Sequence, residues 1–372
     1  MKYTLCITQK CNLACTYCYI GKRNEIMSLE TAKCIVDFIF SNTPKGEKID
    51  IGFFGGEPLT EFELIKSITR LVKNHSLYKD YNVLFDIVSN GTFFSKEIVD
   101  FIKENNVGFC ISCDGPDFLQ DMHRRYADGT TCSKLVENNI KNFTQALPVM
   151  LVNAVYTPDS YVYLPVVVEY FISLGVRQIY LNPDFSAKWS VKDTENLYNI
   201  YEKVSSIFMR QYIDNDPVFI SLIDGKITVI LRGGYKPEER CHMGRKEFAF
   251  TPEGNIYPCE RLIGSGTGDM HCIGNIKTGV NIDKMKCSKF TQNSINTECI
   301  TCGLKDYCMN NCGCSNYFST GGYNSVGAFL CSSEKAALQV SLNAFKELEN
   351  KLGPSFVEHL AGLPSLNSMR KI

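Results

Sequence analysis

Three cysteines near the start of the chain have a spacing that suits iron–sulfur chemistry. Cys11, Cys15 and Cys18 lie in one loop that directly follows an apolar, predicted first strand. Three thiolates on one loop can bind three irons of a [4Fe–4S] cluster and leave the fourth iron for another ligand. Zinc favours a closed tetrahedral set, and no fourth ligand stands nearby in the sequence. The spacing therefore predicts a cluster with one open iron.

A second group of cysteines occupies the C-terminal third. The segment from 241 to 331 holds ten cysteines, many Gly and Asn residues and few long apolar runs. Such a segment cannot build a full core alone, so we expect it to fold around metal. The cysteine spacing suits iron–sulfur clusters, and a pair of structural zinc sites is the alternative.

Composition limits the class of protein. Of the 372 residues 44% are hydrophobic, enough for one large core or two modest ones, and the net charge is −1. This balance shows no electrostatic footprint for nucleic acid or an anionic membrane. No apolar run could span a membrane, and the first residues lack a secretory signal. We therefore expect a cytoplasmic protein. Among its 18 cysteines, those that lie close together in the sequence are expected to bind metal rather than to form disulfides.

The first half of the chain alternates between predicted strands and helices. Nearly continuous apolar strands separated by amphipathic helices are typical of a parallel sheet covered by helices. We predict an α/β fold, a partial (β/α)6 TIM-like barrel followed by a small Cys-rich domain. The predicted strands are Tyr3–Thr8, Ile49–Phe54, Val83–Ser89, Val107–Cys113, Pro148–Tyr156 and Val176–Asn182.

Local signals give some helix starts and one hairpin. Ser28 is expected to cap the first helix, and Thr60 with Glu63 to form a capping box for the second. A long helix is predicted at Ser190–Ile213 and a C-terminal one at Ser333–Leu352, with a hairpin at Glu247–Cys259.

The motifs together resemble the radical S-adenosylmethionine (radical SAM) family. Its signature C-x3-C-x-aromatic-C is matched by Cys11, Cys15 and Cys18 with Tyr17 as the aromatic residue. The resemblance implies that Gly55-Gly56-Glu57-Pro58 contacts the amino group of SAM. It further implies ribose and carboxylate contacts from segments after the third and fourth strands. Those candidates are Ser89, Asn90, Ser112, Asp114, Arg124, Arg125 and, on the fifth strand, Asn153.

The second cysteine group is similar to the SPASM pattern of the same family. Cys241-x12-Gly254-x4-Cys259 is followed by C-x2-C-x5-C-x3-C and a final cysteine. The resemblance implies two auxiliary [4Fe–4S] clusters, and so three clusters in all. It assigns the outer cluster to Cys299, Cys302, Cys308 and Cys331, and the inner one to Cys241, Cys259 and Cys312. Cys272, Cys314 or a substrate thiol could supply the missing fourth inner ligand.

These resemblances divide the chain into four expected parts. They are a radical SAM partial barrel at 1–215, a bridging region at 216–240, a SPASM domain at 241–335, and a C-terminal helix and tail at 336–372. Because the first predicted strand begins at Tyr3, we expect leader recognition by a separate protein or by the barrel surface.

The resemblance implies an enzyme that cleaves SAM reductively to a 5′-deoxyadenosyl radical and modifies a ribosomally made peptide. The leading expectation is a cross-link, a thioether or a similar bond. The alternative is an anaerobic sulfatase-maturing enzyme that makes formylglycine from Cys or Ser, and a remote one is a non-catalytic electron-transfer protein. An electron donor such as flavodoxin or ferredoxin is implied as a partner.

Glu260 is the candidate catalytic residue. It follows Cys259 directly, where sulfatase-maturing enzymes carry an Asp. One interpretation is a surface acid paired with Arg261, since neighbouring side chains on a strand point to opposite faces. The other is a general base, brought into the barrel mouth where the strand ends at Pro258.

Overall fold

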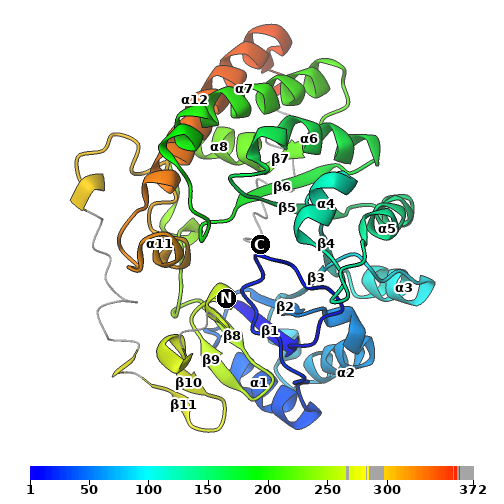
Figure 1. Ribbon diagram of the computed structural model, residues 1–372. Helices are drawn as coiled ribbons and strands as arrows, with labels where there is room; N and C mark the ends of the chain where they lie inside the picture. Colours follow the sequence, from blue (N-terminus) through cyan, green and yellow to red (C-terminus); the bar gives the residue numbers. More distant parts are fainter. Residues whose placement is uncertain (265–267, 282, 285–296, 355, 358–359, 361–372) are drawn as a thin grey trace. The chain divides into compact units, whose positions relative to one another are not determined.

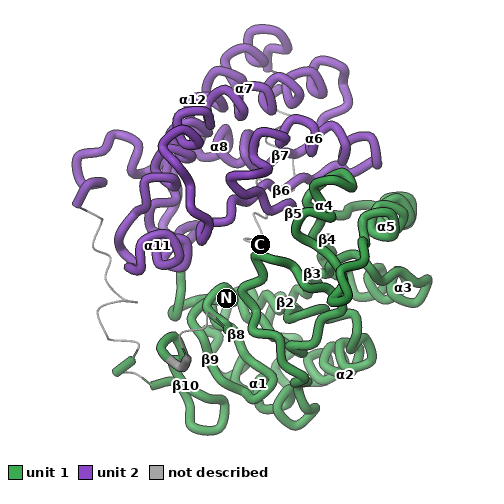
Figure 2. The backbone as a smooth tube through the Cα atoms, in the orientation of Figure 1, with its two compact units in different colours: residues 1–150, 241–293 green, residues 151–240, 294–372 purple. Residues whose placement is uncertain are grey.

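The protein is described by a computed structural model over residues 1–264, 268–281, 283–284, 297–354, 356–357 and 360. The end of the predicted C-terminal tail, 361–372, lies outside the described residues. The chain divides into two compact units, shown in Figure 2. The first unit comprises 1–150 and 241–293, and the second comprises 151–240 and 294–372.

The first unit contains a parallel sheet, drawn in blue to yellow in Figure 1. Parallel pairing runs in the order β8-β1-β2-β3-β4, and antiparallel strands continue from β8 as β9-β10-β11. The parallel strands are β1 (Lys2–Thr8), β2 (Ile49–Gly55), β3 (Val83–Ser89), β4 (Gly108–Ser112) and β8 (Glu247–Phe250). The others are β9 (Asn255–Tyr257), β10 (Gly274–Asn275) and β11 (Gly279–Val280).

Helices follow the strands of the first unit. They are α1 (Leu29–Asn42), α2 (Phe62–Lys73), α3 (Lys96–Glu104), α4 (Asp117–His123) and α5 (Ser133–Ala146). Phe38 of α1 packs edge-on against Phe250 of β8, with ring centroids 5.6 Å apart. Tyr3 of β1 is stacked on Phe248 of β8 at 6.1 Å. Alternation along β1 therefore turns Lys2, Thr4 and Cys6 to the face opposite α1.

The second unit contains three parallel strands and a group of helices, purple in Figure 2. The strands are β5 (Leu151–Tyr156), β6 (Gln178–Pro183) and β7 (Phe219–Ile220). The helices are α6 (Leu164–Ser173), α7 (Val191–Ile213), α8 (Ser221–Leu231), α11 (Gly313–Thr320) and α12 (Ala328–Leu352). α12 packs against both α7 and α8.

Most predicted elements are present, and the α/β class with a parallel sheet is confirmed. Ser28 caps α1 by accepting a hydrogen bond from the Thr31 amide. The prediction of a capping box at Thr60 is wrong. A short 3-10 helix at Pro58–Glu61 precedes α2, and the Thr60 hydroxyl donates a hydrogen bond of 2.7 Å to the Glu57 carbonyl. The predicted hairpin is present as β8 and β9, but its pairing with β1 is visible only in the structure.

Within the described part of the chain, no helix combines the length and apolar character needed to cross a membrane.

Candidate functional site

The cysteine loop lies between β1 and α1 in the first unit. Cys11 and Cys15 are half-buried and Cys18 is exposed. The Leu13 amide donates to the Cys11 sulfur at 3.4 Å, and the Asn90 side-chain amide lies 3.8 Å from the same sulfur. Burial raises the pKa of Cys11 to about 11 and also raises the pKa of Cys15. Iron binding to this loop would therefore release protons.

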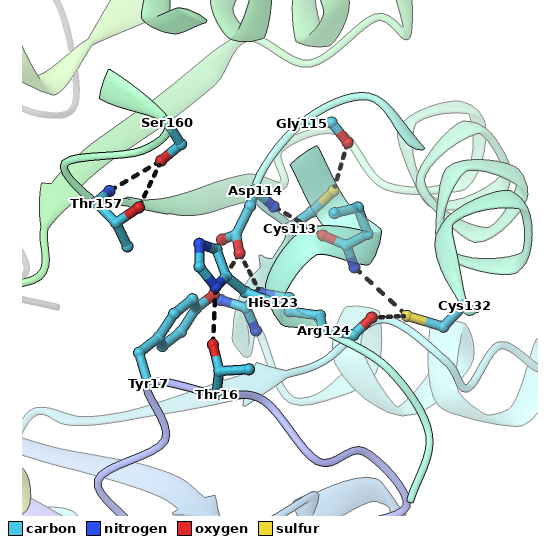
Figure 3. A network of polar contacts seen from close by, with 11 residues as sticks. Thr16, Tyr17, Cys113, Asp114, Gly115, His123, Arg124, Cys132, Thr157 and Ser160 are labelled. Atoms are coloured by element: carbon cyan, nitrogen blue, oxygen red, sulfur yellow. Dashed lines mark hydrogen bonds and ion pairs between the residues drawn. The ribbon is translucent and has the colours of Figure 1, made fainter. Parts of the chain in front are cut away.

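A short backbone ladder fixes this loop against the segment that follows α4. The Ala14 amide donates to the Arg125 carbonyl at 2.6 Å, and the Thr16 amide donates to the His123 carbonyl at 3.0 Å. The Thr16 hydroxyl and His123 Nδ1 share a further hydrogen bond of 2.7 Å (Figure 3). These hydrogen bonds hold the stretch from Ala14 to Thr16, which includes Cys15, against the segment from His123 to Arg125.

A buried polar cluster adjoins the ladder, and Figure 3 shows its members converging. The Tyr17 hydroxyl donates to the Asp114 carboxylate, and Arg124 Nε lies 3.0 Å from the same oxygen. The Arg124 guanidinium also lies 5.3 Å from the centre of the Tyr17 ring, a cation–π distance. Burial makes the largest contribution to the pKa of the Tyr17 hydroxyl, which is raised well above its usual range. Tyr17 and Asp114, predicted from separate motifs, are thus brought together.

The two arginine candidates have different surroundings. Arg124 is buried in the ion pair with Asp114. The Arg125 guanidinium donates to two backbone carbonyls, those of Asp121 at 2.6 Å and Gly129 at 3.1 Å. A role for either arginine at the SAM carboxylate stays a prediction.

Two glycines let the end of β2 approach the start of the cysteine loop. The Gly56 amide donates to the Thr8 carbonyl and the Glu57 amide to the Lys10 carbonyl, both at 2.9 Å. A Cβ at Gly55, where φ is +143°, would lie 2.1 Å from the Thr8 carbonyl oxygen. One at Gly56 would lie 2.0 Å from the Lys10 carbonyl oxygen. Side chains at either position are excluded by the backbone that leads into Cys11.

We expect Gly56→Ala to displace the cysteine loop, because its methyl group would overlap the Lys10 carbonyl. Overpacking of this kind costs roughly 1–3 kcal/mol, and here the strain falls on the backbone beside Cys11. Iron retained by the loop and 5′-deoxyadenosine formation should both fall. Gly52→Ala is the matched control on β2, because its added Cβ would meet only the Thr4 hydroxyl, at 3.8 Å. Equal iron content and activity in the two variants would contradict the expectation.

Glu57 is fully buried and joins the end of β2 to the end of β3. Its carboxylate accepts hydrogen bonds from the amide of Asn90 at 2.6 Å, the amide of Leu59 at 2.9 Å and the hydroxyl of Ser89 at 3.0 Å. Burial raises the pKa of Glu57 to about 7, against the opposing effect of these hydrogen bonds. The carboxylate is thus enclosed by protein donors. A contact of this segment with the amino group of SAM stays a prediction, and the structure gives Pro58 the first position of the 3-10 helix.

The segment after β3 touches the cysteine loop directly. Asn90 donates to the Asn12 side chain at 2.8 Å, and Asn12 donates to the Thr92 hydroxyl at 2.8 Å. Ser112 ends β4 two residues before Asp114. Four of the predicted segments therefore meet beside the cysteines in the first unit. Asn153 belongs to the second unit, where it accepts a hydrogen bond from Asn182 at 2.6 Å.

The predicted auxiliary-cluster cysteines are divided between the units. The outer set, Cys299, Cys302, Cys308 and Cys331, lies wholly in the second unit. The Cys302 amide donates to the Cys299 carbonyl at 3.1 Å, and the electrostatic neighbours of the Cys299 thiol include Cys302 and Cys331. This proximity fits a shared cluster. Of the inner set, Cys241 and Cys259 belong to the first unit and Cys312 to the second, so that grouping stays a prediction.

The two candidates for a fourth inner ligand differ in their surroundings. The Cys314 sulfur lies 3.6 Å from that of Cys312. Cys272 lies in the first unit, where its thiol lies 3.1 Å from the Gly274 carbonyl oxygen. Neither contact assigns the ligand.

A closed site for one zinc ion does not match the cysteine loop. Tetrahedral zinc with sulfur at 2.3 Å would bring the sulfurs to about 3.8 Å from one another. Among the described residues, one group alone brings three possible ligand atoms within 4.8 Å of one another. That group is Glu247, Cys259 and Glu260. The sulfurs of Cys11, Cys15 and Cys18 are therefore not all within 4.8 Å of one another.

Glu260 lies beside the first residues of β1. Its carboxylate binds the Lys2 ammonium at 3.1 Å, its side chain is 14% exposed, and the Thr4 hydroxyl lies 3.4 Å away. The Lys2 ammonium also lies 3.7 Å from Glu247. Burial by itself would raise the pKa of Glu260, but Lys2 holds it below its usual range. The surface interpretation is therefore wrong, because Glu260 sits in a largely buried ion pair on the face of β1 opposite α1.

Sequence reasoning missed Lys2 and the backbone ladder. The signal for Lys2 was present, since a lysine at an alternating position of an otherwise apolar strand needs a buried partner. Ladders between distant loops leave no such pattern, because backbone hydrogen bonds are independent of side-chain identity.

Comparisons with known proteins agree with this site. The sequence profile of the radical SAM superfamily matches residues 5–171. The chain is 25% identical over 331 residues to a cysteine-type anaerobic sulfatase-maturating enzyme of Clostridium novyi, covering 82% of this chain and 85% of that one. It is also 25% identical over 335 residues to the radical SAM cyclopropyl synthase TigE of Paramaledivibacter caminithermalis, covering 83% and 66%.

The fold is shared with solved structures of this group. A structure of native anSMEcpe with bound AdoMet and Cp18Cys peptide has a TM-score of 0.77 and 20% identity, covering 95% of this chain and all of that one. The recognition drawn from the sequence, a radical SAM protein of the SPASM subgroup, is confirmed. The chain is a radical SAM enzyme of the family that includes sulfatase maturases and peptide-modifying enzymes.

Proposed function

We propose that this enzyme modifies a ribosomally made peptide by forming a cross-link, a thioether or a similar bond. The observation that carries the proposal is the ligand count of the inner cysteine set. No cysteine lies between Cys241 and Cys259, so the pattern assigns three inner ligands, Cys241, Cys259 and Cys312. Of the candidates for the fourth position, which are Cys272, Cys314 and a substrate thiol, we propose the substrate thiol. An iron with an open position would accept the thiolate of a substrate cysteine, which is the sulfur that a thioether requires.

The bound groups and the protein have separate tasks. When bound, the cluster at the cysteine loop and SAM supply the 5′-deoxyadenosyl radical, which takes a hydrogen atom from a substrate carbon. The chain itself orients the loop through Gly56, Glu57 and the backbone ladder. The buried Asp114 and Arg124 hold the half-buried Tyr17 ring beside the loop. We propose a low-potential electron donor such as flavodoxin or ferredoxin, and leader recognition by a separate protein or by the barrel surface.

A second candidate, formylglycine formation from Cys or Ser, has its own support. Glu260 stands directly after Cys259 and is held as an anion by Lys2. The likeness to sulfatase-maturating enzymes also extends over most of both chains. A carboxylate beside the inner set could accept the proton that this oxidation releases.

Product mass and labelling with an aldehyde-specific reagent together separate the two reactions. Anaerobic protein is incubated with SAM, dithionite and the peptides or sulfatases encoded by neighbouring open reading frames. A thioether cross-link removes two hydrogen atoms from the peptide and leaves its sulfur. Formylglycine formation from Cys replaces the sulfur by oxygen and removes two hydrogen atoms. Formation from Ser removes two hydrogen atoms, as a cross-link does, but leaves an aldehyde that a hydrazide reagent labels. We expect the first change, and the second would favour the sulfatase-maturing reaction. SAM cleavage without any change in every such substrate would contradict both.

A further inference from the structure

A buried ion pair in the second unit has no part in the proposed chemistry so far. Lys226 of α8 and Glu334 of α12 lie 2.6 Å apart, with side chains 9% and 12% exposed. The Lys226 ammonium is also 3.4 Å from the Tyr235 hydroxyl. A buried ion pair is often no more stabilising than apolar residues of the same size, because both charges must leave water. A contribution to the free energy of unfolding is therefore not enough to explain why this ion pair is present.

The pair lies against two of the four predicted outer-cluster ligands. Glu334 is three residues after Cys331 on α12, so the two side chains lie on one helix face. The Glu334 carboxylate accepts a hydrogen bond of 2.9 Å from the amide of Met309, the residue after Cys308. Burial raises the pKa of the Cys308 thiol, Glu334 raises it further and Lys226 opposes them. Both charges are therefore near enough to act on the Cys308 sulfur.

The surrounding segment holds the same cysteine loop. The Tyr235 amide donates to the Asp306 carbonyl at 2.8 Å, and Arg240 donates to that carbonyl at 3.2 Å. The Tyr235 ring lies within 5.5 Å of the Lys226 ammonium. The segment after α8 thus places Lys226 beside the stretch from Asp306 to Met309, which contains Cys308.

We propose that Lys226 and Glu334 set the reduction potential of the outer auxiliary cluster. The inference rests on the proposed function and on the expected outer cluster, whose assigned ligands are Cys299, Cys302, Cys308 and Cys331. One-electron reduction adds one negative charge to a cluster, and nearby charges are among the factors that determine its potential. An ammonium favours the reduced form and a carboxylate the oxidised form. Within the intact pair the two effects on the potential oppose each other. Removing one charge therefore leaves the effect of the other uncompensated.

The expected size follows from Coulomb's law. A unit charge roughly 12 Å from the added electron, at an effective dielectric constant of about 20, changes the ratio of reduced to oxidised cluster about tenfold. Lys226→Met leaves the Glu334 carboxylate uncompensated and should lower that ratio. Glu334→Gln leaves the Lys226 ammonium uncompensated and should raise it. If the ion pair only stabilised the fold, the two variants would not shift the midpoint potential of the cluster in opposite directions.

The test is a redox titration of the full-length protein, purified anaerobically, with dithionite as the one-electron donor and electron paramagnetic resonance as the readout. The outer-cluster signal is the one lost when Cys299 and Cys302 are replaced by Ala. In Lys226→Met we expect a tenfold lower ratio of reduced to oxidised outer cluster, which equals a midpoint potential about 59 mV more negative. In Glu334→Gln we expect the midpoint potential to shift in the opposite direction. The double variant should return toward wild type, and Lys226→Arg should preserve the potential because it keeps the charge.

Lys351→Met is the matched control. Lys351 lies on the same helix and pairs with Glu347 at 2.7 Å, but both side chains are about half exposed, so solvent screens them. No shift is expected. Unchanged midpoints, or shifts of one sign in both Lys226→Met and Glu334→Gln, would overturn the inference while leaving the proposed function standing. If Lys226→Met does not fold, an unchanged midpoint in Glu334→Gln is sufficient to overturn it. Wild-type protein without an outer-cluster signal would overturn the inference together with the assignment of the outer cluster.

Discussion

Replacing Cys11, Cys15 and Cys18 together by Ala is expected to abolish reductant-driven formation of 5′-deoxyadenosine from SAM. These residues are the predicted ligands of the cluster with an open iron. Hydrogen bonds from the segments after β2, β3 and α4 hold the loop that carries them. Iron should fall from about twelve to about eight atoms per chain, since each cluster holds four. Chromatography of the nucleoside product and an iron assay measure both quantities.

Cys34→Ala is the control for this experiment. Cys34 is an exposed cysteine of α1 outside every predicted ligand set, so its loss tests cysteine removal as such. It should keep both iron and SAM cleavage. Wild-type rates of 5′-deoxyadenosine formation in the triple variant would contradict the assignment of this loop as the SAM site. Loss of all iron would instead show that the C-terminal cysteines bind no cluster of their own.

Glu260→Gln is expected to leave SAM cleavage and iron content intact but to lower peptide product at least about a hundredfold, within the usual range for a lost general base. The substitution keeps the shape and removes the charge. Lys2 holds the Glu260 carboxylate in its anionic form, which is the form that accepts a proton. Product and 5′-deoxyadenosine are measured in the same reaction, so chemistry at the peptide is separated from SAM cleavage.

Glu247→Gln provides the comparison, because Glu247 is also near the Lys2 ammonium, at 3.7 Å, but is not adjacent in sequence to Cys259. We expect product to stay within a few-fold of wild type. Product from Glu260→Gln within a few-fold of wild type would limit Glu260 to its ion pair with Lys2. Equal losses in both variants would assign the effect to the charge balance around Lys2.

The sequence by itself determined the elements and the chemistry of the ligands. Strands such as Val83–Ser89 were predictable because aliphatic, β-branched and aromatic residues predominate in them, although Asp86 interrupts this one. The cysteine loop was predictable because thiolate spacing reflects what a cluster requires of one short segment. Gly55 and Gly56 were recognisable as positions of close backbone approach, and the structure places both against carbonyl groups of the loop.

Only the tertiary structure decided which partners these residues have. The Glu57 carboxylate is enclosed by Leu59, Ser89 and Asn90, and Glu260 is paired with Lys2 rather than lying at the surface. The Lys226–Glu334 pair joins residues 108 positions apart. Charge pairing depends on distance through space, which is set by how strands and helices pack. Local sequence patterns carry periodicity and spacing but no information on which distant side chain will meet a buried charge.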